Sequence, residues 1–440
     1  MIAVQLGEIC TQGLQNALEV LEQCKVETPC WGFVHPFFAP GGQYGIQWWH
    51  LDGAIALDGY KWIDQKTAEN AVRNFMAVQR PDGRIPLWGA DEIPAFPTIG
   101  RPLKEVSSLP ELLRAAAKVA RRSKDPDFVS QTYQLLRRNL DWWTTQRQDP
   151  GTGLLTAMFE ETFRPWLGEM GQYAPVDTNL EAALGFQEAA GLAEHLGLWQ
   201  EAREHREKGR RLMEAVQRYL WEETTGFFHP YLIKEGRRVE DRLAESFYAL
   251  GDPNLSPQRK QRLLALLTDP KAFGWGNRPL TSVALDDPSF TVTHGEYQGN
   301  PSWSGMVWSL INYNVVCALE GAGESGLAAE LAYRTLGIFD HNCTEFADPF
   351  DGSGHGVAAY GWTAAHYLLL IIEHLFGVSY DAWTDRVTVR PNLPFRLLGR
   401  EAALEGLTLP CGGSLSVRVD PQGRVSCRLE NPPEGLKLEP

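Results

Sequence analysis

The chain has 440 residues, of which 43% are hydrophobic and 22% are charged, which is typical of a globular protein with a substantial core. Its formal net charge of −14 argues against nucleic acid or an anionic membrane surface as a partner, because both need a basic stripe on the protein. Its seven cysteines form no Cys-x-x-Cys pair, so the sequence predicts reduced thiols in a cytoplasmic protein and no zinc site.

Helices are predicted from the N-terminus onward. Gly7–Cys24 carries three glutamates among its apolar residues, which predicts an amphipathic helix and not a signal peptide. No apolar run is long enough to span a bilayer. Apolar residues at a period of 3.6 predict further helices over Leu109–Arg122, Asp127–Thr145, Thr178–Leu196, Gln200–Trp221, Pro257–Leu267, Met306–Leu319, Gly326–Phe339 and Gly361–Phe376.

Alternating strand patterns begin after residue 385. They cover Arg386–Arg390, Leu415–Val419 and Arg424–Leu429, and the last two flank a turn that predicts a β-hairpin. We therefore predict an all-α catalytic domain over residues 1–380, in the form of a helical toroid, with a small β unit over residues 381–440.

Aromatic residues are frequent in segments that also carry Gly, Pro and Asp. The chain has 15 Trp, 13 Tyr and 19 Phe. Sugars stack their flat C–H faces on aromatic rings while their hydroxyls bind carboxylates and amides, so such loops favour a carbohydrate site, with core packing as the alternative for each ring. The predicted sugar-binding rings are Trp48, Trp49, Trp303, Trp308, Tyr360 and Trp362.

Two early loops carry further candidates for substrate binding. The glycine-rich segment Pro40–Asp52 ends at a helix start, where Asp52 either holds a sugar hydroxyl or caps the helix. The segment Asp82–Trp88 places Arg84 beside an aromatic residue, where it is either a substrate ligand or a solvated turn residue.

The loop Phe159–Trp166 contains the adjacent carboxylates Glu160 and Glu161 between apolar residues. Burying such groups is costly unless they are protonated or paired, and a raised pKa is what a general acid needs. A solvated acidic loop is the alternative. Asp177 follows at the start of the next predicted helix, where it is either a further acid or a helix cap.

Two late loops, His294–Trp308 and Glu345–His355, carry the remaining candidates. Asp348 and Asp351 could be taken for calcium ligands, but the EF-hand spacing is absent, so no metal site is predicted. The chain has no dinucleotide fingerprint, P-loop or His-Glu-x-x-His motif, so no cofactor is predicted.

The order of these motifs resembles glycoside hydrolase family 63 over roughly residues 35–375. The resemblance includes an aromatic-x-x-Asp helix start, Asp-Gly-Arg-Ile-Pro, the acidic loop, Trp-x-Gly-x-Val-Trp, Glu-x-x-x-Pro-x-x-Gly and Gly-Trp. That family includes processing α-glucosidases and mannosylglycerate or glucosylglycerate hydrolases, and it is related to trehalases, whose signature is similar to Pro40–Tyr44. The resemblance implies an inverting enzyme on an (α/α)6 barrel.

The resemblance also implies two catalytic carboxyl groups. Its base motif maps onto Glu345, and its acid, anchored on the downstream Arg and Trp, maps onto Glu161. Relatives carry an Asp that this chain lacks there, so Glu160 and Asp177 stand as alternates. The expected reaction is exo-acting hydrolysis of a short α-linked sugar by inversion, with a small carbohydrate as the partner and the oligomeric state left open.

Three other functions are consistent with the sequence. The strand Arg386–Arg390 and the Pro-Asn-Leu-Pro after it favour an α-L-rhamnosidase-like hydrolase. A sugar epimerase or isomerase on the same barrel would use histidine bases, for which His294 and His355 are the candidates. A non-catalytic sugar-binding protein would use the aromatic residues but leaves the paired acids unexplained.

Overall fold

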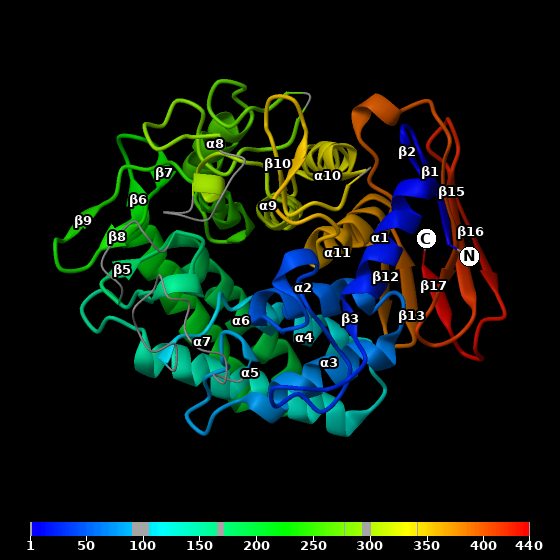
Figure 1. The fold of residues 1–440 in the computed structure, drawn as a ribbon, viewed down its shortest axis with the longest axis horizontal. Helices are drawn as coiled ribbons and strands as arrows, with labels where there is room; N and C mark the ends of the chain where they lie inside the picture. Colours follow the sequence, from blue (N-terminus) through cyan, green and yellow to red (C-terminus); the bar gives the residue numbers. More distant parts are fainter. Residues whose placement is uncertain are drawn as a thin grey trace.

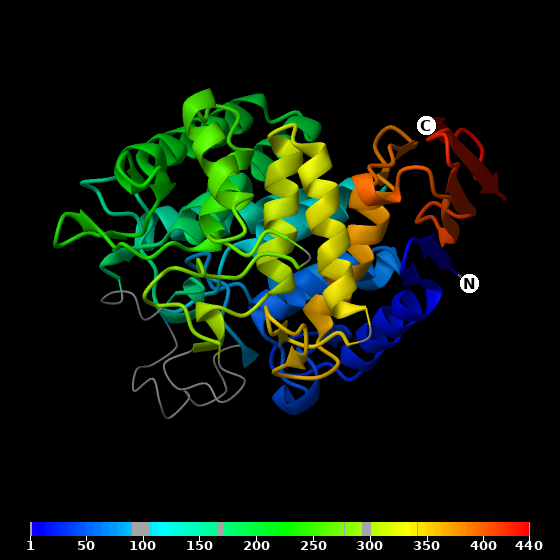
Figure 2. The same cartoon turned by 90° about the horizontal axis from the view of Figure 1, so that it is seen from above.

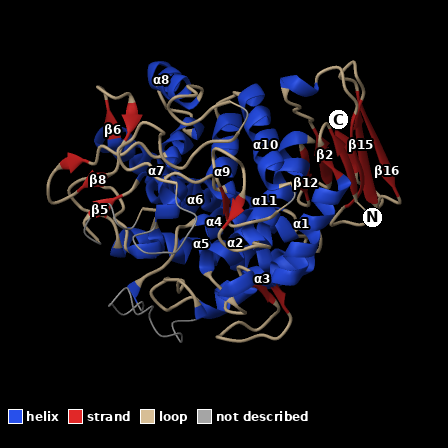
Figure 3. Cartoon of the chain, turned by 45° about the horizontal axis from the view of Figure 1, so that its top comes forward, coloured by secondary structure: helices blue, strands red, loops and turns tan. Residues whose placement is uncertain are grey.

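The computed structural model describes residues 2–89, 105–164, 171–276, 278–292, 301–340 and 342–439. Helices make up most of its body, and the longer strands gather at one side, close to both chain ends (Figures 1 and 3). The fold is therefore predominantly helical with a peripheral β unit, as the sequence predicts.

Six helical segments form an inner layer. Each of them packs against the next in chain order, and the last packs against the first. They are α2 (His50–Tyr60), α4 (Glu111–Arg121), α6 (Val176–His195), the 3-10 segment η6 (Ala244–Gly251), α9 (Ser309–Gly321) and α11 (Gly361–Leu369). All eleven residues of α2 are buried, which is expected for a helix that is covered on every side.

Six further helices lie outside this layer, each packed on one or more of the inner segments. They are α1 (Thr11–Cys24), α3 (Gln65–Val78), α5 (Pro126–Gln146), α7 (Trp199–Ala215), α8 (Pro257–Leu267) and α10 (Ser325–Phe339). Most have one buried and one exposed face, and the side chains of Asp64, Asp125 and Ser256 cap α3, α5 and α8. Figure 2 shows α9 and α10 side by side as an antiparallel pair.

Two predicted helices end differently from the prediction. The segment predicted as Gln200–Trp221 is α-helical to Ala215 and continues as the π-helical turn η5 (Val216–Leu220). The segment predicted as Gly361–Phe376 likewise continues after α11 as the π-helical turn η8 (Leu370–Leu375).

The β unit contains both ends of the chain. Its main sheet has the strand order β16-β15-β14-β1-β2, and β12, β13 and β17 form a smaller sheet. The predicted hairpin is β15–β16, with Val419 opposite Val425. Because the N-terminal strand β1 pairs with β14, the sheet is not made from residues 381–440 alone. The strands are β1 (Ala3–Leu6), β2 (Ile9–Cys10), β12 (Val378–Asp381), β13 (Arg386–Val389), β14 (Ala402–Thr408), β15 (Ser414–Val419), β16 (Val425–Glu430) and β17 (Lys437–Glu439).

Short two-residue strands and 3-10 turns shape the loops of the helical body. The strands are β3 (Lys25–Val26), β4 (Phe37–Phe38), β5 (Tyr173–Ala174), β6 (Trp221–Glu222), β7 (Phe227–Phe228), β8 (Tyr231–Leu232), β9 (Arg237–Arg238), β10 (Phe346–Ala347) and β11 (Gly354–His355). The turns are η1 (Gly42–Tyr44), η4 (Phe159–Glu161), η7 (Pro301–Ser304) and, in the β unit, η9 (Phe395–Leu397). In the described ranges no helix is both long and apolar enough to cross a bilayer.

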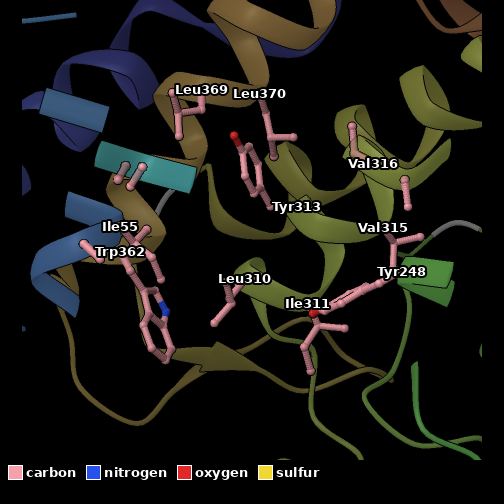
Figure 4. Close-up of a cluster of buried hydrophobic side chains, with 14 of the residues drawn as sticks. Ile55, Tyr248, Leu310, Ile311, Tyr313, Val315, Val316, Trp362, Leu369 and Leu370 are labelled. Atoms are coloured by element: carbon pink, nitrogen blue, oxygen red, sulfur yellow. The ribbon is translucent and has the colours of Figure 1, made fainter. Parts of the chain in front are cut away.

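The core lies between the inner segments. Figure 4 shows Leu310 and Ile311 of α9 between Tyr248 of η6 and Trp362 of α11. This packing fixes the starts of α9 and α11 relative to each other, and the loops before these helices carry most of the predicted site residues.

Candidate active site

The loops that lead into the inner helices meet at one end of the helical body. Asp52 lies in the first turn of α2, and Trp308 and Tyr360 are the residues before α9 and α11. Backbone contacts join these loops. Val307 and Ala347 form an isolated antiparallel β-bridge, and the N–H of Gly361 donates to the carbonyl of Pro40. Segments far apart in the sequence therefore form one site.

Glu345 is a buried carboxyl group at this end. The hydroxyl of Tyr44 donates to its Oε1 at 3.1 Å, and the N–H of Val357 donates to its Oε2 at 3.1 Å. Burial raises its pKa to about 7, and the charges of Asp52 and Glu160 also raise it. Among the described residues, no lysine or arginine forms an ion pair with it, so the carboxyl group keeps its raised pKa.

Asp52 has a similar environment. It is 6% exposed and accepts a hydrogen bond of 2.7 Å from the hydroxyl of Tyr360. Burial raises its pKa to about 6. The residue at the N-cap of α2 is Trp49, so Asp52 does not cap this helix. Ala359, next to Tyr360, has φ +55, a backbone conformation that is strained for a non-glycine residue and is common at functional sites.

Glu161 is fully buried and ion-paired, which argues against the predicted role of proton donor. Arg147 holds both of its oxygens, with Nε 2.7 Å from Oε2 and Nη2 2.8 Å from Oε1. The N–H groups of Ser107 and Met158 donate to the same oxygens at 2.9 Å each. These four donors occupy both oxygens of Glu161, whereas a general acid must present its carboxyl group to the glycosidic oxygen. The sequence motif does not reveal the pairing with Arg147.

Asp177 also has donors on both oxygens. It accepts hydrogen bonds from the hydroxyl of Thr162 at 2.9 Å and from the N–H groups of Phe163 and Thr178 at 2.8 Å each. Burial raises its pKa, and these hydrogen bonds lower it. The N-cap of α6 is Pro175, so Asp177 is not the cap; it ties the acidic loop to the first turn of α6.

Glu160 lies half-buried beside the fully buried Glu161. Its backbone carbonyl accepts from the N–H of Leu109 at 3.1 Å, which fixes the turn η4. Phe159, directly before it, has the strained value φ +33. The charge of Glu160 contributes to the raised pKa values of Glu345 and Tyr44, so it shares their surroundings.

Arg164 joins the acidic loop to the loop before α9. Its guanidinium lies 3.0 Å from Glu245, donates to the carbonyl of Ser282 at 2.9 Å and also donates to the carbonyl of Trp303. Burial raises the pKa of Glu245 to about 7, although the charge of Arg164 lowers it.

Aromatic rings form two connected groups around the carboxyl groups. Trp303 and Trp308 stack with centroids 3.6 Å apart, and Trp362 meets Trp308 edge-on at 5.7 Å. Tyr360 lies 4.8 Å from Trp362 and 6.0 Å from Tyr44. The indole N–H of Trp362 is buried and has no acceptor within the described ranges.

The second group contains Trp49 and Trp88, whose centroids are 4.4 Å apart, and Tyr44 lies 5.9 Å from Trp49. Arg84 is 5% exposed, so it is not a solvated turn residue, and its Nη1 donates to Val106 at 2.8 Å, next to Trp88. Both Arg84 and Trp49 therefore lie near the site end.

Trp48 packs in the core, which argues against its predicted role in substrate binding. It is 0% exposed, stacks on Phe33 at 4.3 Å and donates its indole N–H to the carbonyl of Trp31 at 3.1 Å. Adjacent side chains leave the backbone in different directions, so Trp48 enters the core while Trp49 faces Tyr44.

Among the histidines considered as bases, His294 lies outside the described residues. His355 is half-buried, and its Nε2 lies 2.7 Å from the hydroxyl of Ser353. The carboxylate of Asp348 accepts from the N–H of Phe350 at 2.6 Å, as in an ordinary turn. No group of three or more potential metal-binding side chains occurs in the described part of the chain.

Tyr44 is a site residue that the sequence prediction missed. It lies in the Pro40–Asp52 segment that had been singled out for its glycines, tryptophans and aspartate. Its position in the motif was a usable signal, but its hydrogen bond to Glu345, 301 residues away, follows from the fold alone.

Comparison with known proteins gives a family match and several similar folds. The model of the mannosylglycerate hydrolase MGH1-like glycoside hydrolase domain matches residues 45–167 and 162–363. A mannosylglycerate hydrolase of Rubrobacter radiotolerans is 25% identical over 188 residues, which are 42% of this chain and 41% of that protein.

Two solved structures resemble the fold. The GH63 mannosylglycerate hydrolase from Thermus thermophilus, in complex with glucose, has a TM-score of 0.65 at 20% identity, covering 80% of this chain and 98% of its own. A GH78 rhamnosidase of Bacillus sp. GL1 has a TM-score of 0.68 at 16% identity, covering 98% of this chain and 42% of its own. At these identities, the likeness concerns the fold.

Proposed function

The chain belongs to the family of mannosylglycerate hydrolase MGH1-like glycoside hydrolase domains, and from this premise we propose that it is an inverting glycoside hydrolase with Glu160 as general acid and Glu345 as general base. Its body is an (α/α)6 barrel, a proposal supported by the six inner segments that pack in order with the last against the first. The single observation that carries the function is the placement of three carboxyl groups, Glu345, Asp52 and Glu160, around Tyr44. Among the described residues, no lysine or arginine forms an ion pair with Glu345.

Glu160 is preferred over Glu161 because both carboxylate oxygens of Glu161 are already held by donors. Arg147 and the N–H groups of Ser107 and Met158 donate four hydrogen bonds to them. Glu160 is half-buried, and its charge contributes to the raised pKa of Glu345. When protonated, a carboxyl group in this place can donate its proton to the glycosidic oxygen.

Glu345 suits the role of base. Its two hydrogen-bond donors, Tyr44 and the N–H of Val357, leave acceptor positions for a water molecule. A conjugate acid with a pKa near 7 makes it a stronger base than an ordinary carboxylate. Inversion requires the two carboxyl groups about 6.5–9.5 Å apart, so that water fits between the base and the sugar.

The substrate is a short α-linked sugar bound at its non-reducing end. Asp52, oriented by Tyr360, binds sugar hydroxyls, and the free N–H of Trp362 binds another. The named substrate of the curated relative makes α-linked glycosylglycerates the first compounds to test. The protein acts in the cytoplasm, a proposal supported by its seven free cysteines, which suit a reducing compartment.

The test compares three variants on two kinds of substrate. Glu160→Gln loses hydrolysis of natural α-linked sugars but retains activity on aryl glycosides, whose leaving groups need little protonation. Glu161→Gln loses thermal stability, because Arg147 is left without its partner, and the folded fraction keeps the same ratio of activities on the two substrates as wild type. The anomer of the first product, followed by NMR, reports inversion.

A different result for these variants identifies a different acid. One such result is that Glu160→Gln keeps wild-type activity on natural sugars, whereas Asp177→Asn loses this activity but still hydrolyses aryl glycosides. In that case the acid is Asp177. Retention of the anomeric configuration would contradict the inverting mechanism altogether.

An α-L-rhamnosidase-like hydrolase is the second candidate. The observation in its favour is that the GH78 superposition extends over 98% of the chain and so includes the β unit, whereas the GH63 superposition covers 80%. Release of rhamnose from an aryl α-L-rhamnoside, with no release of glucose or mannose from the matching α-glycosides, would favour this candidate.

A further inference from the structure

A second group of ionisable side chains lies at the other end of the inner helices. Asp58 is six residues after Asp52 in α2, which places it about 9 Å further along the helix. Lys61 and Lys118 both pair with Asp58, and both also pair with Glu373 on η8, at 2.7 and 3.8 Å. We refer to Asp58, Lys61, Lys118 and Glu373 as the distal cluster.

Cys317 lies beside this cluster and has a histidine partner. Its sulfur is 3.9 Å from Nε2 of His374, and Nδ1 of His374 is 2.9 Å from a carboxylate oxygen of Glu320. Cys317 and Glu320 are on α9, whereas His374 is on the π-helical turn η8. Single π-helical turns are rare and occur often at functional sites. A thiol, an imidazole and a carboxylate in this order resemble the arrangement that activates a nucleophilic sulfur.

The charges around Cys317 favour its thiolate. Although burial raises the pKa of the thiol, His374 and the nearby cations Arg114 and Lys118 bring it below its ordinary value. The charged and titratable groups that face it are Arg114 and Lys118 on α4, Glu181 on α6, Tyr313 on α9 and His374 on η8. Burial raises the pKa of Glu181 well above its usual range, although the charge of Arg114, 3.6 Å away, lowers it.

The other cysteines lack this environment. Burial raises the pKa of Cys24 and of Cys343 to about 12, and it also raises the pKa values of Cys30, Cys411 and Cys427. Cys317 is half-buried. Reactive cysteines occur in such electropositive, partly exposed places.

We propose that Cys317 and His374 form a thiolate–imidazolium pair that is a modification site for small electrophilic oxidants, with hydrogen peroxide as the simplest. The thiolate attacks one peroxide oxygen, so that an S–O bond forms and the O–O bond breaks. The leaving hydroxide takes the proton of His374 and departs as water. Sulfur is oxidised to a sulfenic acid, and peroxide is reduced. This chemistry is separate from the hydrolysis proposed above.

The first experiment measures labelling of each cysteine by iodoacetamide in the full-length protein, with peptide mass spectrometry, from pH 6 to pH 8. The labelling rate of an ordinary exposed thiol falls about 100-fold when the pH is lowered from 8 to 6. Cys317 is expected to lose less than about 10-fold, because it stays ionised. The exposed Cys10 in the same sample is the internal comparison. After treatment with hydrogen peroxide, dimedone should label Cys317 in wild type and not in Cys317→Ser.

A histidine variant tests the partner. His374→Gln is expected to lower the labelling of Cys317 at pH 6 by about 10-fold or more, with less effect at pH 8. His195→Gln is the matched control, because His195 stacks on Trp383 away from the thiol, and it should leave Cys317 unchanged. If His374→Gln fails to fold, the proposal is decided by the pH dependence of the ratio between the labelling rates of Cys317 and Cys10 in the wild-type protein. The proposal is overturned if Cys317 follows the same pH dependence as Cys10, or if dimedone labels Cys10 and not Cys317.

Discussion

Carboxyl groups are buried at both ends of the inner helices, but their partners differ. Glu345 and Asp52 have tyrosine hydroxyls as partners, and burial raises their pKa values to about 7 and about 6. At the distal end burial also acts to raise the pKa of Glu373, but the charges of Lys61 and Lys118 outweigh it and hold this pKa well below its usual range. A buried carboxyl group can therefore exchange a proton near neutral pH at one end, whereas at the other end it stays ionised.

This difference explains why composition alone does not locate a catalytic site. The distal cluster also contains two carboxyl groups, Asp58 and Glu373, but Lys61 and Lys118 pair with them. Unpaired burial costs stability, so a protein keeps it where a reaction needs it. The comparison predicts opposite responses to the same Glu→Gln change at the two ends.

The largest expected effect is on catalysis. Glu345→Gln should lower kcat by about 1,000-fold or more on natural and aryl substrates alike, because water needs its base whatever the leaving group. Glu373→Gln should keep kcat within about fivefold when assayed below its melting temperature, since Glu373 is at the far end. Steady-state kinetics measure both. Comparable loss of kcat in the two variants would remove the distinction between the ends.

The second effect is on folding at the distal end. Glu373→Gln should lower the free energy of unfolding by about 2–4 kcal/mol at pH 7, because it removes one of the two carboxylates that pair with the buried Lys61 and with Lys118 and leaves Asp58 alone to balance them. Urea unfolding measures it. Glu188→Gln is the matched control, since Glu188 is as exposed as Glu373 (18%) but pairs with the more exposed Arg121, and it should cost less than about 1 kcal/mol. Equal losses would mean that the distal pairs contribute no more than surface pairs.

The third effect is an increase in the free energy of unfolding, opposite in sign to the loss expected for Glu373→Gln. The folded-state pKa of Glu345, about 7, lies above its ordinary value of 4.5, so wild type loses stability as the pH rises from about 4.5 through 7. Glu345→Gln removes this loss and should be more stable than wild type by about 1–3 kcal/mol at pH 8, with a difference that vanishes near pH 4.5. Urea unfolding across this pH range measures it. A variant less stable than wild type at pH 8 would contradict the unpaired burial of Glu345.

Sequence patterns predicted the parts of the fold that depend on local periodicity. The predicted bounds of α4, α5, α6, α8 and α10 lie within about two residues of the observed ones, because a 3.6-residue apolar repeat is a local signal. The inner segment η6 was not predicted, since eight residues show too little of a period. The pairing of β1 with β14 was not predicted either, because it joins residues some 400 positions apart.

Candidate site residues could be proposed from the sequence where a motif lies in one stretch of chain. Asp52 and Glu345 were proposed in this way, and the structure places both beside tyrosine hydroxyls at the same end of the helical body. The partner of Glu161 was not, because Arg147 comes from the end of α5 and no local pattern links it to the acidic loop. What separates Trp48 from Trp49 is the direction of each side chain, which the backbone sets.

The smallest expected effect tests the role of Glu345 itself. Tyr44→Phe removes a hydrogen bond that favours the ionised carboxylate, so the pKa of Glu345 should rise by about half a unit to one unit. If Glu345 is the base, the acidic limb of the pH profile of kcat/KM moves to higher pH, which costs about 3–10-fold at pH 6 and little at pH 8.5. If Glu345 were the acid, the basic limb would move instead, and activity at high pH would rise. Tyr367→Phe, which removes a hydrogen bond to the distant Asp340, is the control and should move neither limb.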